Sequence, residues 1–248
     1  MKYFEREKLI LVFIFSCFAI VAKSQIPEYV FSGGKGLIGK GVIQSDFGLS
    51  TARNELDTTG FSLQYGPYVS FKYGVGKNTH ISFNYSFSRT SQFISDVVQK
   101  SNVSPSYTVG VAQGLFNNWS IRSNLSFSSI NPTWSNTSWQ NQIIAEYPVG
   151  ERFTWQNNLG SSWNLNSIQP TFNYLSGLTY TIPRPFDLIL EFYGNFNRDV
   201  QNYFTNVGTG IYFSKNLMTE IYLGYGLQAG QTSAFGSINF YYRLLPAK

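Results

Sequence analysis

Charged side chains, cysteine and histidine are scarce in this sequence. Only 12% of the 248 residues are charged, whereas a soluble domain has about 25%. With one histidine and one cysteine, only scattered carboxylates remain as metal ligands, so we predict no metal site and no cofactor. The formal net charge of +5 is modest and gives no reason to expect a nucleic-acid partner.

Long apolar runs are also missing. The mean hydropathy of −0.13 is far below that of a bundle of membrane helices. The apolar stretch at residues 9–22 follows three basic residues, is too short to span a bilayer comfortably, and precedes a small-x-small cleavage site at residues 22–24. We therefore predict that residues 1–24 are a signal peptide and that the chain is exported. Cys17 lies in this segment, so the mature chain would have no disulfide, while a lipid anchor at Cys17 would cut the apolar stretch in half.

Aromatic residues are abundant, at 18% of the chain, and apolar side chains alternate with polar ones. Residues 217–228 show the alternation clearly, with Leu217, Thr219, Ile221, Leu223, Tyr225 and Leu227 on one parity and Met218, Glu220, Tyr222, Gly224, Gly226 and Gln228 on the other. A period of two is typical of a β-strand with one apolar face. The alternation returns after a polar break at residues 230–233, which predicts a hairpin.

The same pattern recurs over most of the chain, with no helical pattern between the strands. No second layer of protein is available to cover the apolar faces, but a lipid bilayer can cover the outside of a closed sheet. Short breaks predict five inner turns on the periplasmic side, at residues 76–78, 116–118, 149–152, 182–185 and 214–216. Five such turns and a free strand at each end give about twelve strands, an even number as in bacterial barrels. The sequence predicts an all-β fold, a transmembrane antiparallel up-and-down β-barrel.

Residues 41–248 would form this barrel. Its water-exposed outer loops are expected to be short, at residues 53–57, 92–102, 131–136, 164–169 and 196–203. The preceding segment, residues 25–40, is Gly-rich and poorly periodic, so it would hang in the periplasm or fold into the mouth of the barrel.

The five tryptophans, with many tyrosines and phenylalanines near strand ends, suit aromatic girdles at the two bilayer interfaces. The alternative is a surface that stacks nucleic-acid bases or sugars. It would need basic or carboxylate partners clustered beside the rings.

The inward parity of the strands predicts a polar lumen. Its charged and tyrosine side chains would be Lys72, Arg122, Glu146, Asp187, Glu191, Glu220, Arg243, Tyr68, Tyr193, Tyr212, Tyr222 and Tyr241. Counting back from the hairpin loops predicts two opposite-charge cross-strand pairs, Arg122 with Glu146 and Glu220 with Arg243. Such pairs would steady the lumen or form a substrate-selective constriction. About twelve strands give a backbone diameter of roughly 24 Å, which inward rings could nearly fill.

Some outer-membrane barrels are lipid hydrolases with a His-x-Ser pair, and this sequence contains one such pair. His80 and Ser82 have that spacing, but both fall on the inward parity directly after an inner turn, whereas lipid substrates approach from the outer leaflet. The residues after Ser82 also depart from the His-x-Ser-Asn pattern. We predict that the protein is not an enzyme.

The C-terminal half carries a family resemblance. Its motifs are FNYLSGLTY at 172–180, LEFYG at 190–194, VGTGIY at 207–212 and YLGYGL at 222–227, with FNNWSI at 116–121 in the middle of the chain. On these motifs the chain resembles the exported barrel family described as the meta-pathway of phenol degradation, often named simply a transporter. The resemblance implies an outer-membrane channel for small, aromatic or hydrophobic compounds and supplies no catalytic residues.

The chain departs from that family at its end, RLLPAK, which lacks a terminal aromatic residue. Its signal for the barrel assembly machinery would rest on Phe240 and Tyr242. Two functions stay open: a channel in the bacterial outer membrane that passes a small-molecule solute, and a non-conducting structural or adhesive barrel. The lipid bilayer is the expected partner in both.

Overall fold

The computed structural model of the chain describes residues 37–56, 60–94, 97–116, 118–128, 136–165, 169–182, 185–228 and 230–245. The predicted signal peptide and residues 25–36 lie outside the described residues. No described helix is long and apolar enough to cross a membrane.

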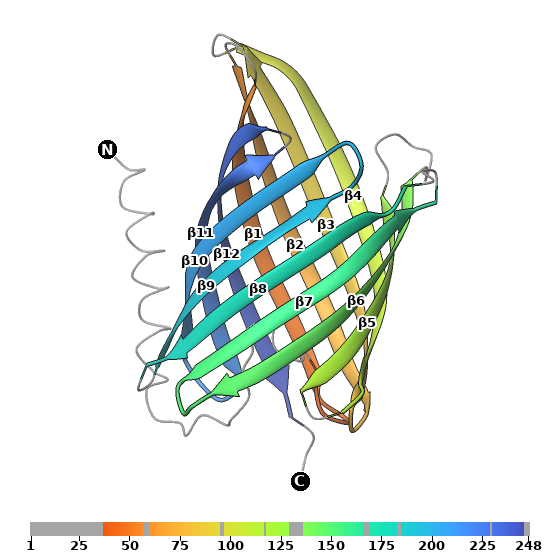
Figure 1. The fold of residues 1–248 in the computed structure, drawn as a ribbon, viewed down its shortest axis with the longest axis vertical. Coiled ribbons are helices and arrows are strands. Elements are labelled where there is room, and N and C mark those ends of the chain that lie inside the picture. Colours follow the sequence, from red (N-terminus) through yellow and green to blue (C-terminus); the bar gives the residue numbers. More distant parts are fainter. Residues whose placement is uncertain are drawn as a thin grey trace, which may run out of the picture.

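The described residues form twelve antiparallel strands that close into one barrel, with β1 hydrogen-bonded to β12 (Figure 1). This confirms the predicted fold and strand number. The strands are β1 (Ile43–Leu56), β2 (Gly60–Gly76), β3 (Thr79–Ile94), β4 (Val97–Gly114), β5 (Trp119–Ser128), β6 (Asn136–Val149), β7 (Phe153–Asn164), β8 (Thr171–Thr181), β9 (Phe186–Phe196), β10 (Gln201–Tyr212), β11 (Leu217–Gln228) and β12 (Gln231–Leu244).

The two faces of the sheet differ as the alternation predicts. On β9, Leu188 and Leu190 are exposed, while Asp187 and Ile189, which alternate with them, are buried inside the barrel. The outer face of the barrel therefore consists largely of exposed apolar side chains, which water would not favour and lipid would. Closure leaves no strand edge unpaired, so the backbone is also compatible with hydrocarbon.

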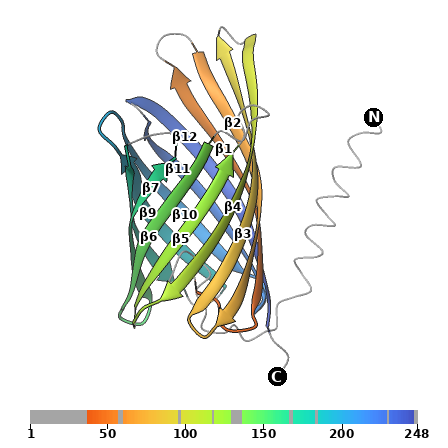
Figure 2. The same ribbon diagram turned by 90° about the vertical axis from the view of Figure 1, so that its right-hand side faces the viewer.

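The five short connections at one end, here called the inner end, lie at the predicted inner turns. The prediction of an outer loop at residues 92–102 is wrong, because β3 continues to Ile94 and β4 begins at Val97. Together with β2, these strands rise above the rest of the barrel (Figures 1 and 2). The Phe61 and Phe93 rings stack at 4.8 Å across the extension. Its polar residues, such as Ser91, Gln92 and Asn102, give the extension the composition of a loop.

A similar correction applies at residues 53–57, where β1 runs on to Leu56 and β2 begins at Gly60. Arg53 lies over the Phe61 ring, with its guanidinium carbon 4.4 Å from the ring centroid. This cation–π contact stabilises the charged Arg53 side chain on the strand.

The chain before β1 folds against the inner faces of β2 and β4 at the inner end. The Gly41 amide donates to the Gly74 carbonyl at 2.8 Å, and the Gly74 amide donates to the Val42 carbonyl at 3.0 Å. The Gly39 carbonyl occupies the space that a side chain at Gly74 would need. Ile38 is only 2% exposed, so residues 37–42 fill part of the inner mouth.

Candidate functional site: the barrel lumen

The register places all twelve predicted lumen residues on the inner face of their strands. Their neighbours differ from the prediction. Arg122 lies opposite Gln142 rather than Glu146, and Glu220 lies opposite Asn239 rather than Arg243, so both predicted charge pairs are wrong.

In both hairpins the register is centred two residues before the predicted position. Gln228 pairs with Gln231, so the β11–β12 hairpin turns between these two residues, and Gly230 in this turn has a positive φ of 82°. The sequence predicts this turn at the polar break of residues 230–233, whose centre lies two residues later. That shift moves the predicted partner of each β11 residue by four positions along β12. An even displacement changes the partner but keeps the face, because side chains alternate with a period of two.

The charges of β1, β2 and β12 instead form one connected network. Lys72 Nζ lies 2.8 Å from Asp46 Oδ2, and Gln44 Nε2 donates to Asp46 Oδ1 at 2.7 Å. Arg243 Nε donates to Gln44 Oε1 at 2.6 Å. Asp46 was not among our predicted lumen residues, although the same parity rule, applied to β1, would have found it.

Tyrosines hold other polar groups of the inner face. Tyr241 donates its hydroxyl to Glu220 Oε2 at 2.7 Å, and Tyr212 donates to Asp187 Oδ2 at 2.6 Å. The Tyr68 hydroxyl reaches Asn239 Oδ1 at 3.1 Å. These hydroxyl–carboxylate bonds join neighbouring strands and stabilise carboxylates that water no longer solvates.

Tyr68 makes its bond by crossing a whole strand. Its ring starts on β2, passes over Gly48 of β1 and ends at Asn239 of β12. A Cβ at Gly48 would lie 2.1 Å from the ring, so only glycine leaves space for it. The ring consequently lies along the wall instead of across the lumen.

Other inward rings also lie along the wall. Phe235 lies over Gly224, where a Cβ would be 2.0 Å from its ring. Tyr193 and Phe204 stack at 5.2 Å, and Phe235 meets both edge-to-face, at 6.1 and 5.9 Å. The three rings form a cluster on β9, β10 and β12, here called the aromatic cluster. Glycine at positions 48 and 224 thus lets the Tyr68 and Phe235 rings lie along the wall.

The opposite wall carries small polar side chains. On the inner faces of β3 to β5 these include Ser82, Asn84, Ser86, Thr108, Asn124 and Ser126. Thr108 and Ser126 share a hydrogen bond of 2.8 Å. The lumen is thus asymmetric, since short polar residues face a wall of rings and carboxylates.

A cavity of about 440 Å³ lies against the wall of rings and carboxylates, and we call it the lumen cavity. Its lining comes mainly from the inner faces of β1, β2 and β9 to β12, and includes Glu191, Glu220, Tyr193 and Tyr222. Along β1 the cavity touches Ser50 but not Asp46. It therefore lies farther from the inner end of the barrel than the Lys72–Asp46 pair does. An open space with polar and aromatic lining is suited to a small organic molecule.

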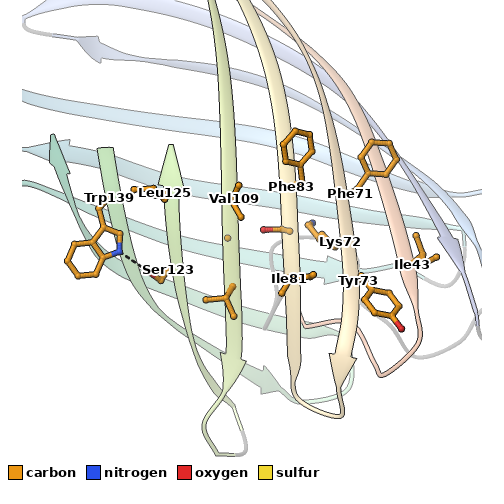
Figure 3. A pocket seen from close by; sticks show the side chains of 13 residues that line it. Ile43, Phe71, Lys72, Tyr73, Ile81, Phe83, Val109, Ser123, Leu125 and Trp139 are labelled. Carbon is orange, nitrogen blue, oxygen red and sulfur yellow. Dashed lines mark hydrogen bonds between the residues drawn. The ribbon is translucent and has the colours of Figure 1, made fainter. Parts of the chain in front are cut away.

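A larger cavity, of about 680 Å³, belongs to the outer wall (Figure 3). Most of its lining residues, such as Phe71, Phe83 and Val109, are exposed apolar residues. In it the Trp139 indole donates to Ser123 Oγ at 2.8 Å. The bond gives the Ser123 hydroxyl a hydrogen-bond partner on an apolar surface. Because this cavity is on the apolar outer face, we assign it to lipid chains.

The His-x-Ser pair lies on the inner face of β3. His80 is buried beside Ala112 and Gly74, close to the segment that fills the inner mouth. Ser82 lies between Lys72 and Gly110. Among the described residues no group of three or more His, Cys, Asp or Glu side chains is placed to bind a metal.

A closed twelve-stranded barrel with an apolar outside and a polar inside defines the class of the protein: it has the fold of outer-membrane channels. Solved structures show the same architecture. The COG4313 outer membrane channel from Pseudomonas putida F1 has a TM-score of 0.67 at 11% identity, covering 88% of this chain and 100% of that chain. The KdgM porin has a TM-score of 0.53 at 12% identity, covering 79% and 98%.

The CymD monoaromatic hydrocarbon channel has a TM-score of 0.51 at 9% identity, covering 90% of this chain and 95% of that chain. At such low identity the likeness concerns the fold alone. No family model and no curated protein matches the sequence, so membership of the meta-pathway family stays a prediction. The structural neighbours named here are two channels and a porin.

Proposed function

We propose that this protein is a channel in the outer membrane of a bacterium and that it passes small organic solutes through its lumen. The observation that carries the proposal is the lumen cavity, an open space of about 440 Å³ inside a closed barrel. The diameter of a barrel grows with its number of strands, so a twelve-stranded barrel is wider than the eight-stranded barrels that side chains can fill.

The lining of the cavity suggests the kind of solute. Rings of the aromatic cluster would contact an apolar or aromatic body, and the carboxylates and hydroxyls would contact polar groups. The structural neighbour CymD, a monoaromatic hydrocarbon channel, is consistent with such a cargo. We further propose that the chain is exported by residues 1–24 and is inserted by the barrel assembly machinery through Phe240 and Tyr242 on β12.

The alternative is a non-conducting barrel, and one observation favours it. Residues 37–42 fill part of the inner mouth, where Ile38 and Val42 are buried. If this segment stays in place, it narrows the path between the lumen cavity and the inner end of the barrel. The two functions therefore differ in whether current flows past the segment.

Conductance in planar lipid bilayers tests the proposal. Two refolded chains are compared, one beginning at Gln25 and the other at Gly41. We expect both to conduct, with a larger unitary conductance for the shorter chain because it lacks residues 37–40, which include the buried Ile38. Silence of both chains in repeated reconstitutions would contradict the channel, while current from the shorter chain alone would mean that the intact barrel is closed.

A further inference from the structure

Four neighbouring strands, β5 to β8, carry polar side chains on their outer face (Figure 1). Each of these residues lies two positions from an exposed apolar residue of its own strand, so it points outward too. They lie in two rows of register partners, on either side of the Ile143–Leu159 pair. One row is Ser123, Asn141 and Ser161, the other is Asn157 and Ser176, and we call the two rows together the polar strip.

The polar strip lies deep in the apolar band. Rings near the two ends of β6, Trp139 and Tyr147, mark the aromatic girdles, and Ile143 is midway between them. Two residues along a strand, at about 3.4 Å each and tilted by about 40°, correspond to about 5 Å of depth. Asn141 precedes Ile143 by two residues, and Asn157 lies opposite the residue that follows it by two. Both amides therefore lie about 5 Å from the middle of the band.

Neither asparagine of the polar strip has a hydrogen-bonded side chain among the described residues. The nearby indoles donate to serines instead, Trp163 to Ser161 at 3.2 Å and Trp155 to Ser176 at 3.0 Å. A primary amide has two donor hydrogens and an acceptor oxygen, and lipid chains can bond to none of them. Polar groups at this depth are costly unless a partner satisfies them.

Other polar residues of the outer wall do not have this problem. Among the described residues of the remaining strands, outward amides occur only at strand ends, at Gln113 and Gln201. Both are hydrogen-bonded, and Gln201 accepts from the Tyr203 hydroxyl at 2.6 Å. Farther inside the band, Thr209 donates to the Asp187 carbonyl at 3.0 Å. The two asparagines thus stand apart from the rest of the outer wall.

The shape and charge of this face also favour contact with protein. A groove of about 480 Å³ adjoins the row that contains Asn141, and exposed apolar residues such as Ile143 and Leu159 complete its lining. The outward residues of β5 to β8 include no charged side chain. A hollowed, neutral and partly polar wall suits packing against another membrane protein, where polar side chains bond across the contact.

We propose that the polar strip is the interface of a homodimer, in which two copies of the chain meet through β5 to β8. The two amides need a partner with polar groups at their own depth, and a second copy inserted in the same direction necessarily has them there. A twofold axis along the membrane normal puts each asparagine at the depth of its counterpart, and one amide complements another. The absence of charge lets the two faces meet without repulsion. This dimer requires that the barrel lies in a membrane, but not that it conducts.

Disulfide cross-linking in lipid vesicles tests which face is covered. A chain that begins at Gln25 has no cysteine, so one cysteine is placed at Ile143, in the middle of the polar strip. The comparison is a cysteine at Leu223 on β11, which is also exposed but lies outside the strip. We expect oxidation to convert most of the Ile143→Cys chain and little of the Leu223→Cys chain to dimers. Similar yields at the two positions, or no dimer at either, would overturn the proposal.

Variants test whether the amides hold the dimer together. Energy transfer between donor- and acceptor-labelled chains, followed as lipid is added, gives the dissociation constant of the dimer. Replacing both asparagines, Asn141→Leu with Asn157→Leu, should weaken the dimer about tenfold or more and leave the barrel at least as stable, since leucine suits lipid. Thr209→Val, which removes an outward hydroxyl on β10, is the matched control and should leave association unchanged.

Two results of the energy-transfer experiment would contradict the dimer. Unchanged association in the double variant would show that the amides do not hold two copies together. A chain that is monomeric at every lipid dilution would show that a second copy does not cover the strip. If the double variant fails to fold, the comparison of the Ile143 and Leu223 cysteines still decides.

Discussion

Leu223→Arg is the substitution that most sharply probes the outer face. Leu223 is the seventh of the twelve residues of β11 and is 68% exposed. Its register partners are Val207 on β10 and Gly236 on β12, which bear no charge that could pair with an arginine. If lipid surrounds this face, the guanidinium lies near the bilayer midplane, where it should cost about 2 to 4 kcal/mol of folding free energy.

Leu227→Arg is the matched control, on the same strand and the same face. Four residues at about 3.4 Å each, tilted by about 40°, place Leu227 about 10 Å nearer the outer interface. The apolar band of such barrels is about 25 Å tall, so this arginine reaches the headgroups and should cost at most about 1 kcal/mol.

Guanidinium unfolding in lipid vesicles, followed by tryptophan fluorescence, gives both free energies of unfolding. A second control, Asn84→Arg, puts the charge on the small polar wall of the lumen and should also cost little. Equal losses at Leu223 and Leu227 would refute the depth argument, and an equal loss at Asn84 would refute the assignment of faces.

Three further substitutions probe the inner wall and a turn. Lys72→Ala leaves the buried Asp46 carboxylate without its cation and should cost about 3 kcal/mol of unfolding free energy. Adding Asp46→Ala should restore part of that loss. Additive losses in a double-mutant cycle would show that the pair does not interact. Gly48→Ala puts a Cβ 2.1 Å from the Tyr68 ring and should cost about 1 to 3 kcal/mol of unfolding free energy, measured with denaturant. The cost should be much smaller in a Tyr68→Ala background. An equal cost in both backgrounds would show that the ring does not occupy this space. Gly230→Val forces a β-branched residue to a positive φ and should cost about 1 to 2 kcal/mol, whereas Gly230→Asn should be tolerated; equal unfolding midpoints would contradict the turn geometry.

The faces of the strands were predictable because they depend only on parity. Arg122 and Glu220 lie on the inner face as the alternation indicates, although the residues opposite them differ from those we expected. The partner depends on the length of a turn, which is set by local backbone conformation such as the positive φ at Gly230. Alternation alone does not report it.

The lumen cavity was not predictable for a different reason. Counting inward rings suggested a filled interior, since the sequence does not show which rings lie flat against the wall. That depends on glycines of neighbouring strands, such as Gly48 beneath Tyr68, which are far apart in sequence and meet only once the register is known.

Site-directed spin labelling of β3 tests the two-faced barrel most directly. The only cysteine, Cys17, lies in the predicted signal peptide, so single cysteines can be placed at residues 81–86 of a chain that begins at Gln25 without a background thiol. In lipid vesicles, labels at Ile81, Phe83 and Tyr85 should collide with oxygen dissolved in the bilayer, and labels at Ser82, Asn84 and Ser86 with a water-soluble nickel complex. Neighbouring positions with the same accessibility, or odd positions that meet water, would contradict the account.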